Sequence, residues 1–255
     1  MLPFLNPIIS ANVSVPFEVA TEQIETRFAG NPSHSKKCPS YLLTLPEVVS
    51  VPDKFILLTA CIIEDDTNVV DIGCSTGKMT QRLLEENKDH CSDASYVGVE
   101  IAEGFFKDLD NRYKDITKNN PWAEVNFIKD DIRNYKFENC SLVTSIFTLQ
   151  FMSKRYRKLV IERIYDGLNC GGAYIFAEKT ICENALVQDM ITFNYYDYKR
   201  KSFTTEDIMD KERTLRHMMK PNTWKEIEGM LTEVGFSVIQ PFWRNHAFIG
   251  ALAVK

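Results

Sequence analysis

The fold of this 255-residue chain is decided by residues 69–78, Val-Val-Asp-Ile-Gly-Cys-Ser-Thr-Gly-Lys. The β-branched residues at its start favour a buried strand, and Gly73 with Gly77 predicts a tight strand-to-helix turn where backbone approaches a ligand closely. A second apolar run, Tyr96 to Glu100, ends in an acid 27 residues beyond Gly73. A parallel strand that ends there presents a carboxylate to ribose hydroxyls. Together the two runs predict a site for a nucleoside-bearing cofactor.

Two other nucleotide motifs fail on spacing. A phosphate loop needs four residues between its glycines and a hydroxyl after the lysine, whereas Gly73 to Gly77 is one residue short and Met79 follows Lys78. The dinucleotide motif G-x-G-x-x-G is absent, because Cys74 and Ser75 follow Gly73. ATP hydrolysis and dinucleotide-dependent oxidoreduction are therefore set aside.

The composition is that of a globular enzyme rather than a disordered or fibrous chain, with 44% hydrophobic and 25% charged residues. A net charge of -5 argues against general electrostatic binding to nucleic acid, and the basic runs 154–158 and 199–201 are best interpreted as solvated helix faces. Seven cysteines without C-x-x-C spacing predict neither a disulfide framework nor a zinc or other metal site. We therefore expect a cytoplasmic protein, without the roughly 18 apolar residues of a membrane span.

Strands and helices alternate from residue 69 onward, which predicts a mostly parallel α/β sheet with helices on both faces. Strands are expected over 69–73, 96–100, 124–128, 141–146, 173–178, 236–243 and 247–254. Helices are expected over 17–28, 76–86, 102–118, 153–168, 183–219 and 223–234, the last ending at Gly235. The last two strands have only three residues between them, so they should form an antiparallel hairpin at the sheet edge.

Four regions follow from this pattern. We expect an N-terminal helical cap (1–63), a cofactor-binding core (64–182), a helical lid or dimerisation segment (183–220), and a C-terminal helix and hairpin (221–255) that complete the sheet.

Ligands on an open parallel sheet bind at the carboxyl ends of the strands. The backbone of 73–77 and the next helix N-terminus are expected to face an anion such as an amino-acid carboxylate. Glu100 is expected to accept hydrogen bonds from ribose hydroxyls. One carboxylate of Asp130-Asp131 is expected to accept a hydrogen bond from an adenine amine, while Ile132 packs on the adenine ring. Residues 146–150 are expected to form the pocket floor.

The lid segment adds two aromatic candidates. Tyr195 and Tyr196 lie on a predicted helix, where a ring face can attract a sulfonium, although packing of the lid is at least as good an explanation. Cys74 is better explained as a small side chain beneath a cofactor than as a nucleophile, because no histidine lies near it in the sequence.

The chain resembles the class I S-adenosylmethionine-dependent methyltransferases, and within them the carboxy-S-adenosylmethionine synthase family of tRNA wobble-uridine modification. The likeness covers roughly residues 65 to 240 and rests on 71–75 (DIGCS), 131–133 (DIR), 147–151 (FTLQF), 164–169 (IYDGLN), 171–173 (GGA), 178–179 (EK) and 197–200 (DYKR). It implies a Rossmann-like seven-stranded sheet, a homodimer, and S-adenosylmethionine or its carboxylated form as cofactor. The implied cofactor contacts are Gly73, Cys74, Ser75, Glu100, Ile101, Asp131 and Ile132.

Three positions depart from the family pattern. The family's arginine that binds the carboxylate of the carboxylated sulfonium matches Glu212, with Arg213 one position away. The family's cofactor-binding asparagine after the fourth strand matches Ile146. Its substrate-side tyrosine corresponds to Tyr41, although an ungapped match falls on Val48.

Three interpretations of function follow. The first is a carboxylated-sulfonium synthase in which Arg213 binds the carboxylate, Tyr41 faces the substrate and prephenate donates the carboxyl group. The second, which we prefer, is a methyltransferase whose acceptor enters beneath residues 1–45 and 183–220. The third is a cofactor-binding regulator without turnover. Composition does not distinguish a small-molecule acceptor from tRNA or DNA.

Overall fold

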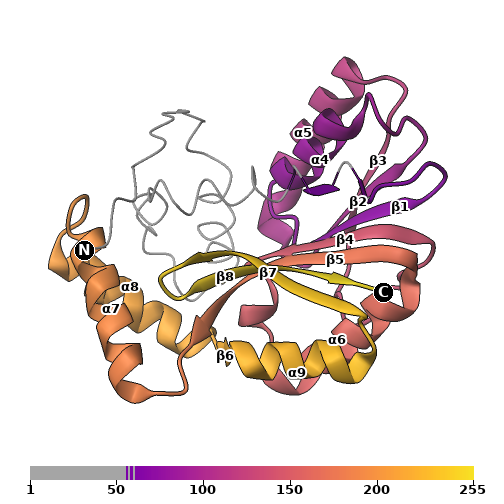
Figure 1. Ribbon diagram of the computed structural model, residues 1–255. Coiled ribbons are helices and arrows are strands. Elements are labelled where there is room, and N and C mark those ends of the chain that lie inside the picture. The colour runs from indigo at the N-terminus through magenta and orange to yellow at the C-terminus, as the bar shows by residue number, and fades with distance from the viewer. Residues whose placement is uncertain (1–55, 57, 60) are drawn as a thin grey trace, which may run out of the picture.

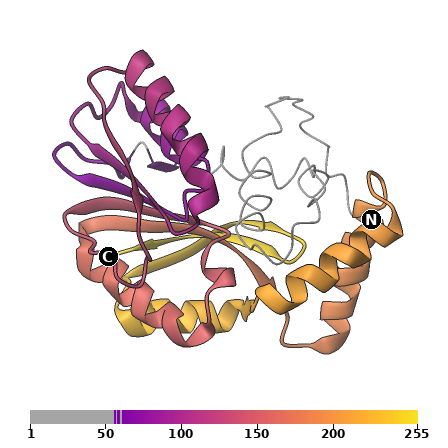
Figure 2. The same cartoon turned by 180° about the vertical axis from the view of Figure 1, so that it is seen from behind.

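The structure is a computed structural model that describes residues 56, 58–59 and 61–255. The expected helix over 17–28, most of the expected cap and Tyr41 lie outside these residues. The described part is one α/β unit with a twisted central sheet and helices on both of its faces (Figures 1 and 2).

The strands along the main sheet lie in the order β3-β2-β1-β4-β5-β8-β7. They are β1 (Asn68–Ile72), β2 (Ser95–Glu100), β3 (Glu124–Lys129), β4 (Cys140–Ile146), β5 (Leu168–Ile181), β7 (Val238–Asn245) and β8 (Phe248–Val254). The first five pair in parallel, whereas β8 is antiparallel to both β5 and β7. The expected seven strands form the path of the sheet, and the two-residue β6 (Asn222–Thr223) lies off this path and pairs with the end of β5.

Alternate residues of the strands face different helix pairs. Val69 packs in a cluster with Leu83 of α4 (Lys78–Asn87) and Ile116 of α5 (Phe106–Asn119). Val70 points the other way, into a cluster with α6 (Lys154–Gly167) and α9 (Trp224–Val234). Full burial of each such side chain stabilises the fold by about 1.5 to 3 kcal/mol. The consecutive apolar residues of β1 are therefore required by a sheet covered on both faces.

Backbone conformation moves two helix starts from where the sequence placed them. Gly77 has a φ of 73°, a left-handed value that a helix interior does not accept, so α4 begins at Lys78 rather than at residue 76. The next helix begins as a 3-10 turn, η3 (Glu103–Phe105), before α5. A second 3-10 turn, η4 (Leu149–Phe151), follows β4 and is formed by residues expected to be the pocket floor.

The expected helical segment 183–219 consists of two helices, α7 (Ala185–Lys199) and α8 (Thr205–Met218), beyond the end of β5 (Figure 1). Residues 200–204 separate them. Thr204 Oγ1 accepts from the Asp207 N–H at 3.2 Å, and the Asp207 carboxylate accepts from the Thr204 N–H at 3.2 Å. This reciprocal cap fixes the start of α8.

The C-terminal expectations are confirmed. Gly235 ends α9 with a φ of 115°, and β7 and β8 form the antiparallel hairpin, with β7 at the sheet edge. The hairpin turn is shorter than expected, since only His246 and Ala247 lie between the strands. In the part of the chain that the structure describes, no helix is long and apolar enough to cross a membrane.

Candidate functional site

A cavity of about 400 Å³ lies at the carboxyl ends of β1 to β4, where the sequence placed the cofactor. This volume lies within the roughly 300 to 1,000 Å³ usual for small-molecule sites. Five of the expected cofactor residues line it: Gly73, Glu100, Ile101, Asp131 and Ile132. The topology brings these residues together from three parts of the sequence, because parallel strands end at the same edge of the sheet.

The turn after β1 is held by hydrogen bonds to β2. The N–H groups of Gly73 and Cys74 donate to the Val99 carbonyl at 2.7 and 3.2 Å, and that of Gly77 donates to the Cys74 carbonyl at 2.9 Å. This differs from the expectation that the N–H groups of this turn face an anion. The physical reason for Gly73 is that its N–H continues the parallel ladder, in which Ile72 of β1 pairs with Val99 of β2. The left-handed φ of Gly73, Ser75 and Gly77 then turns the chain so that the Ser75 N–H meets Glu100 and the Gly77 N–H meets Cys74.

Glu100 is a structural centre of the site as well as part of its lining. Its side chain is buried, and its Oε2 accepts from the Ser75 N–H at 3.0 Å. Its Oε1 accepts from the N–H groups of Ile101 and Ala102, each at 2.9 Å. One carboxylate therefore joins the turn after β1 to the turn after β2. The ribose role expected for Glu100 stays a prediction.

Asp131 faces the cavity beside an arginine that sequence reasoning did not single out. Its carboxylate accepts from the Arg133 backbone N–H at 2.9 Å and from the Arg133 guanidinium at 2.8 to 2.9 Å. The guanidinium holds the pKa of Asp131 below its ordinary value. Arg133 also lies 5.1 Å from the ring centre of Tyr156, and both line the cavity. The adenine role of Asp131 stays a prediction.

Asp71 lies in β1, two residues before the turn begins at Gly73. It is buried, with Oδ2 accepting from Thr80 Oγ1 at 2.9 Å and Oδ1 accepting from Thr144 Oγ1 at 3.0 Å. Burial raises the pKa of Asp71 from 3.8 to about 6, the charge of Glu100 adds to this, and the two hydrogen bonds oppose it.

We expect the stability of an Asp71→Asn protein, relative to the parent, to be greater at pH 8 than at pH 4. The folded state binds the Asp71 proton more tightly than the unfolded state, so the ionised carboxylate costs stability at neutral pH, and this cost disappears as pH falls through 6 toward 3.8. The stability of the variant relative to the parent should be about 1 to 3 kcal/mol more favourable at pH 8 than at pH 4. Urea unfolding at both pH values measures it, with the exposed Asp110→Asn as control. An equal stability difference at both pH values would contradict the assignment.

Several expected site residues lie outside the lining of this cavity. Cys74 and Ser75 are buried beneath the turn, and Ile146 is buried in the core cluster of α4 and α5. Tyr195 packs on the β7–β8 hairpin, with ring centres 5.3 Å from His246 and 5.9 Å from Phe248. This supports the packing explanation for Tyr195 rather than contact with a sulfonium.

Two neighbouring residues of opposite charge on α8 point in different directions. The Arg213 side chain is 75% exposed and its Nη1 pairs with Asp210 at 2.6 Å, away from the cavity. Glu212 is turned inward, 17% exposed, with its Oε1 3.6 Å from Lys199 Nζ. Burial lowers the pKa of Lys199 to about 8, against the opposing effect of Glu212. Tyr196 lies near this pair, and the charge of Glu212 together with burial raises its pKa.

Other lining residues were missed by sequence reasoning. Met152, Ser153 and Tyr156 follow η4 and line the cavity. The sequence signal for them is their position just after the carboxyl end of β4, at the start of α6. Met218, at the end of α8, also lines the cavity, and no local pattern points to it because only the tertiary fold brings it there.

Comparison with known proteins agrees with this geometry. Residues 70–174 match a family model described as a methyltransferase domain. A putative O-methyltransferase from Nostoc punctiforme superposes with a TM-score of 0.57 at 17% identity, covering 92% of this chain and 66% of that one. Carboxy-S-adenosyl-L-methionine synthase of Staphylococcus epidermidis is 30% identical over 94% of this chain and 98% of its own. The enzyme of that name from Shewanella oneidensis is 30% identical over 91% and 92%.

The chain has the fold of the class I S-adenosylmethionine-dependent methyltransferases and is an enzyme of that transferase fold. The residues present fit S-adenosylmethionine, because the cavity combines the acidic side chains of Glu100 and Asp131 with the apolar side chains of Ile101 and Ile132. Within this class the chain belongs to the carboxy-S-adenosyl-L-methionine synthase family.

Proposed function

We propose that the protein transfers the methyl group of S-adenosylmethionine to an acceptor, and that it does not make the carboxylated cofactor. The observation that carries this proposal is the arrangement of α8. Glu212, at the position of the family's arginine, pairs with Lys199 of α7, and Arg213 is exposed and pairs with Asp210. Neither side chain lines the cavity, so this part of α8 supplies no cation there for the carboxylate of a carboxylated sulfonium.

Two further features support methyl transfer. Ile146, at the position of the family's asparagine, is buried in the core and carries no polar group. The sulfonium of S-adenosylmethionine already activates its methyl carbon, so the protein chiefly has to orient the two reactants. Methyl transfer therefore does not require a strong general base in the cavity.

The alternative is synthesis of the carboxylated cofactor from S-adenosylmethionine and prephenate. The relatives from Staphylococcus epidermidis and Shewanella oneidensis bear that name and match nearly the whole chain, which is the observation in its favour. Tyr41, its expected substrate-side residue, lies outside the described residues.

Mass spectrometry separates the two. The purified chain is incubated with S-adenosylmethionine and prephenate, and, separately, with S-adenosylmethionine and a panel of acceptors that includes small metabolites and tRNA. We expect S-adenosylhomocysteine from an acceptor reaction and no carboxylated sulfonium. A carboxylated sulfonium formed only in the presence of the protein would overturn the proposal, whereas cofactor binding without any turnover would favour the regulator.

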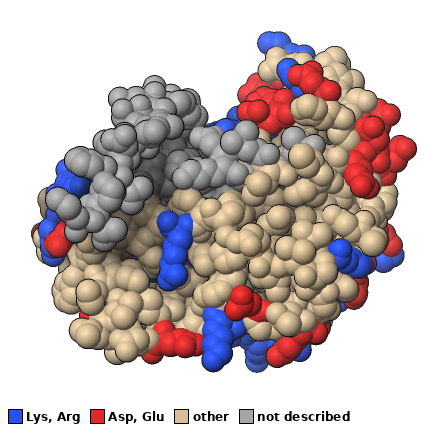
Figure 3. Space-filling view, viewed as in Figure 1, with Lys and Arg blue, Asp and Glu red and all other residues tan. Residues whose placement is uncertain are grey.

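The charge distribution favours a small-molecule acceptor. On the face drawn in Figure 3, basic side chains stand apart or next to acidic ones, and acidic side chains gather at the upper right, over the side of α4 and α5. This agrees with the net charge of -5. A chain of net negative charge gains little general electrostatic attraction to a duplex or a folded RNA, so the tRNA arm of the panel should stay unmethylated.

We also propose that a second copy of this chain packs on α7. Its outer face exposes Leu186, Met190 and Phe193 by 62 to 70%, at a spacing that forms one stripe. An antiparallel pair of α7 helices about a twofold axis would bury the two apolar stripes against each other.

We expect a Met190→Asp protein to be monomeric at concentrations where the parent is dimeric. The substitution places two unpaired carboxylates at the centre of the α7 pair, where desolvation is costly. Light scattering after size-exclusion chromatography measures the mass. Asp110→Asn serves as a surface control, and a parent that is monomeric at 100 µM, or a Met190→Asp dimer, contradicts the α7 interface.

A further inference from the structure

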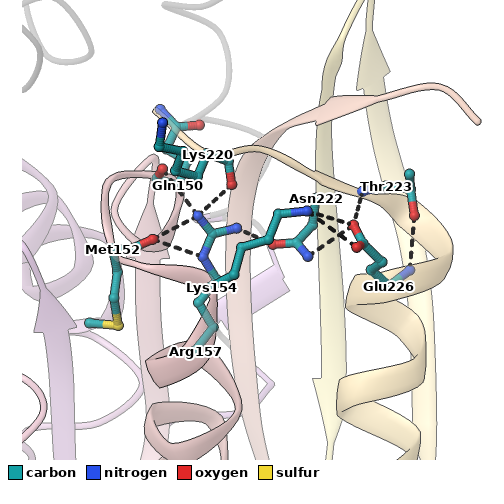
Figure 4. A network of polar contacts seen from close by, with 8 residues as sticks. All are labelled: Gln150, Met152, Lys154, Arg157, Lys220, Asn222, Thr223 and Glu226. Atoms are coloured by element: carbon teal, nitrogen blue, oxygen red, sulfur yellow. Dashed lines mark hydrogen bonds and ion pairs between the residues drawn. The ribbon is translucent and has the colours of Figure 1, made fainter. Parts of the chain in front are cut away.

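Arg157 of α6 is a buried arginine whose hydrogen bonds gather two segments distant in sequence (Figure 4). It is only 3% exposed. Its Nη2 donates to the carbonyls of Met152 at 2.8 Å, Gln150 at 3.2 Å and Lys220 at 2.5 Å, and its Nη1 donates to Asn222 Oδ1. One side chain thus holds residues 150–152 and residues 220–222 at the same point.

Both segments carry part of the cofactor cavity. Phe151, Met152 and Ser153 come from the first, and Met218 lies two residues before the second. The segments are also joined directly, since the Lys220 N–H donates to the Gln150 carbonyl at 3.0 Å. Arg157 itself is not among the lining residues. It therefore stands behind the wall of the cavity, on the side away from the ligand.

The chemistry of the arginine suits this position. Burial lowers the pKa of Arg157, opposed by the charges of Glu178 and Glu226, and a guanidinium remains protonated in proteins. Its planar fork reaches four acceptors at once, which a lysine ammonium does not. Glu178, also buried, accepts from the Leu149 N–H at 2.9 Å and so fixes the start of the same segment.

We propose that Arg157 is a positioning residue that sets the affinity of the cavity for S-adenosylmethionine, by holding the wall formed by residues 151–153 and Met218. The proposal rests on the assignment of this cavity to the cofactor. Loss of the guanidinium lets the end of α8 move away from η4, so the cavity loses one wall while the sheet and its other ligand contacts remain.

Titration calorimetry with S-adenosylmethionine tests the proposal. An Arg157→Ala protein, checked as folded by circular dichroism, should show at least a tenfold higher dissociation constant. Millimolar methylguanidinium should restore most of the affinity, because it can occupy the vacated site and reach the same carbonyls. Arg157→Lys keeps the charge but should bind as weakly as Arg157→Ala.

A control of similar stability separates positioning from general destabilisation. Ile164 of the same helix is buried among apolar residues, so Ile164→Val lowers stability without touching the network. It should keep the parent's affinity and show no response to methylguanidinium. If Arg157→Ala does not fold, Asn222→Ala, which removes one acceptor, replaces it in the test. Its dissociation constant for S-adenosylmethionine is expected to rise by a smaller factor, about threefold.

The outcomes are distinct. The proposal is overturned if folded Arg157→Ala binds S-adenosylmethionine with the parent's affinity. The same holds for Asn222→Ala where that variant replaces Arg157→Ala in the test. Weakening by Ile164→Val equal to that by Arg157→Ala also overturns it, as does the absence of rescue by methylguanidinium. A parent protein that binds no S-adenosylmethionine overturns the assignment of the cavity itself, and with it the proposed function.

Discussion

A Glu100→Gln protein is expected to bind S-adenosylmethionine at least tenfold more weakly than the parent, while staying folded. The Glu100 carboxylate accepts N–H groups from Ser75, Ile101 and Ala102. Glutamine has the same shape but replaces one acceptor oxygen with a donor NH2, so at least one of these buried N–H groups must face another donor. An unsatisfied buried donor costs about 1 to 3 kcal/mol, and 1.4 kcal/mol is a factor of ten in affinity.

The same residue allows the ribose role to be separated from the support of the turns. A cofactor analogue that lacks a ribose hydroxyl should bind more weakly than S-adenosylmethionine to the parent, but equally well to Glu100→Gln, if Glu100 contacts that hydroxyl. This double cycle isolates the contact between the two groups. If the analogue loses the same affinity in both proteins, Glu100 acts only through the backbone of the two turns.

A matched control lies three residues away. Glu103 is exposed on η3, so Glu103→Gln removes the same charge near the cavity without altering a buried hydrogen bond. It should leave the dissociation constant within a factor of two. Equal loss in both variants would show that net charge, and not the bridging carboxylate, decides the affinity.

The sheet was predictable from the sequence because burial on both faces imposes a simple pattern. The apolar runs of β1, β2 and β4 and the alternation with helices place the carboxyl ends, and hence Gly73, Glu100 and Asp131, at one edge. Periodicity sets these elements, and topology then sets the site.

Side-chain partners were not predictable in the same way. The sequence shows an acid at the end of β2, but not that its oxygens accept three backbone N–H groups. The Ser75 N–H reaches Glu100 only through the left-handed turn at Gly73 and Ser75, and the N–H groups of Ile101 and Ala102 reach it only through the turn after β2. Likewise Glu212 and Arg213 are adjacent in sequence, and only the packing of α8 on α7 decides which faces inward. The family resemblance identifies residue 212 as a position that departs from the pattern, but only the structure shows the direction in which its side chain points.

The β6 strand and the wall at Met218 are further cases of tertiary context. A two-residue strand has no periodicity to detect, and it forms because β5 runs on to Ile181. Arg157, which ties this region to η4, lies in a basic run interpreted from the sequence as a solvated face. For Arg157 that interpretation is wrong, since its side chain points inward between α6 and the strand ends.

We expect a Gly98→Ala protein to lose about 2 to 3 kcal/mol of stability and to bind S-adenosylmethionine weakly, because the added methyl group overfills the base of the site. A Cβ at Gly98 would lie 2.5 Å from Phe127 Cδ1 and 2.8 Å from Cys74 Sγ. Gly98 and Phe127 are direct partners in the pairing of β2 with β3. The ring of Phe127 also lies 2.6 Å from where a Cβ of Gly77 would be.

Phe127 thus fills a space that two glycines leave open, beneath the turn that carries Gly73. If this is the reason for the loss, a smaller side chain at 127 should relieve it. The double variant Gly98→Ala with Phe127→Leu should recover more than half of the stability and of the cofactor affinity lost by Gly98→Ala, measured by urea unfolding and titration calorimetry. Gly104→Ala is the matched control, since a Cβ there meets nothing within 4 Å. Losses that simply add in the double variant would mean that Gly98 is required for another reason than the position of the Phe127 ring.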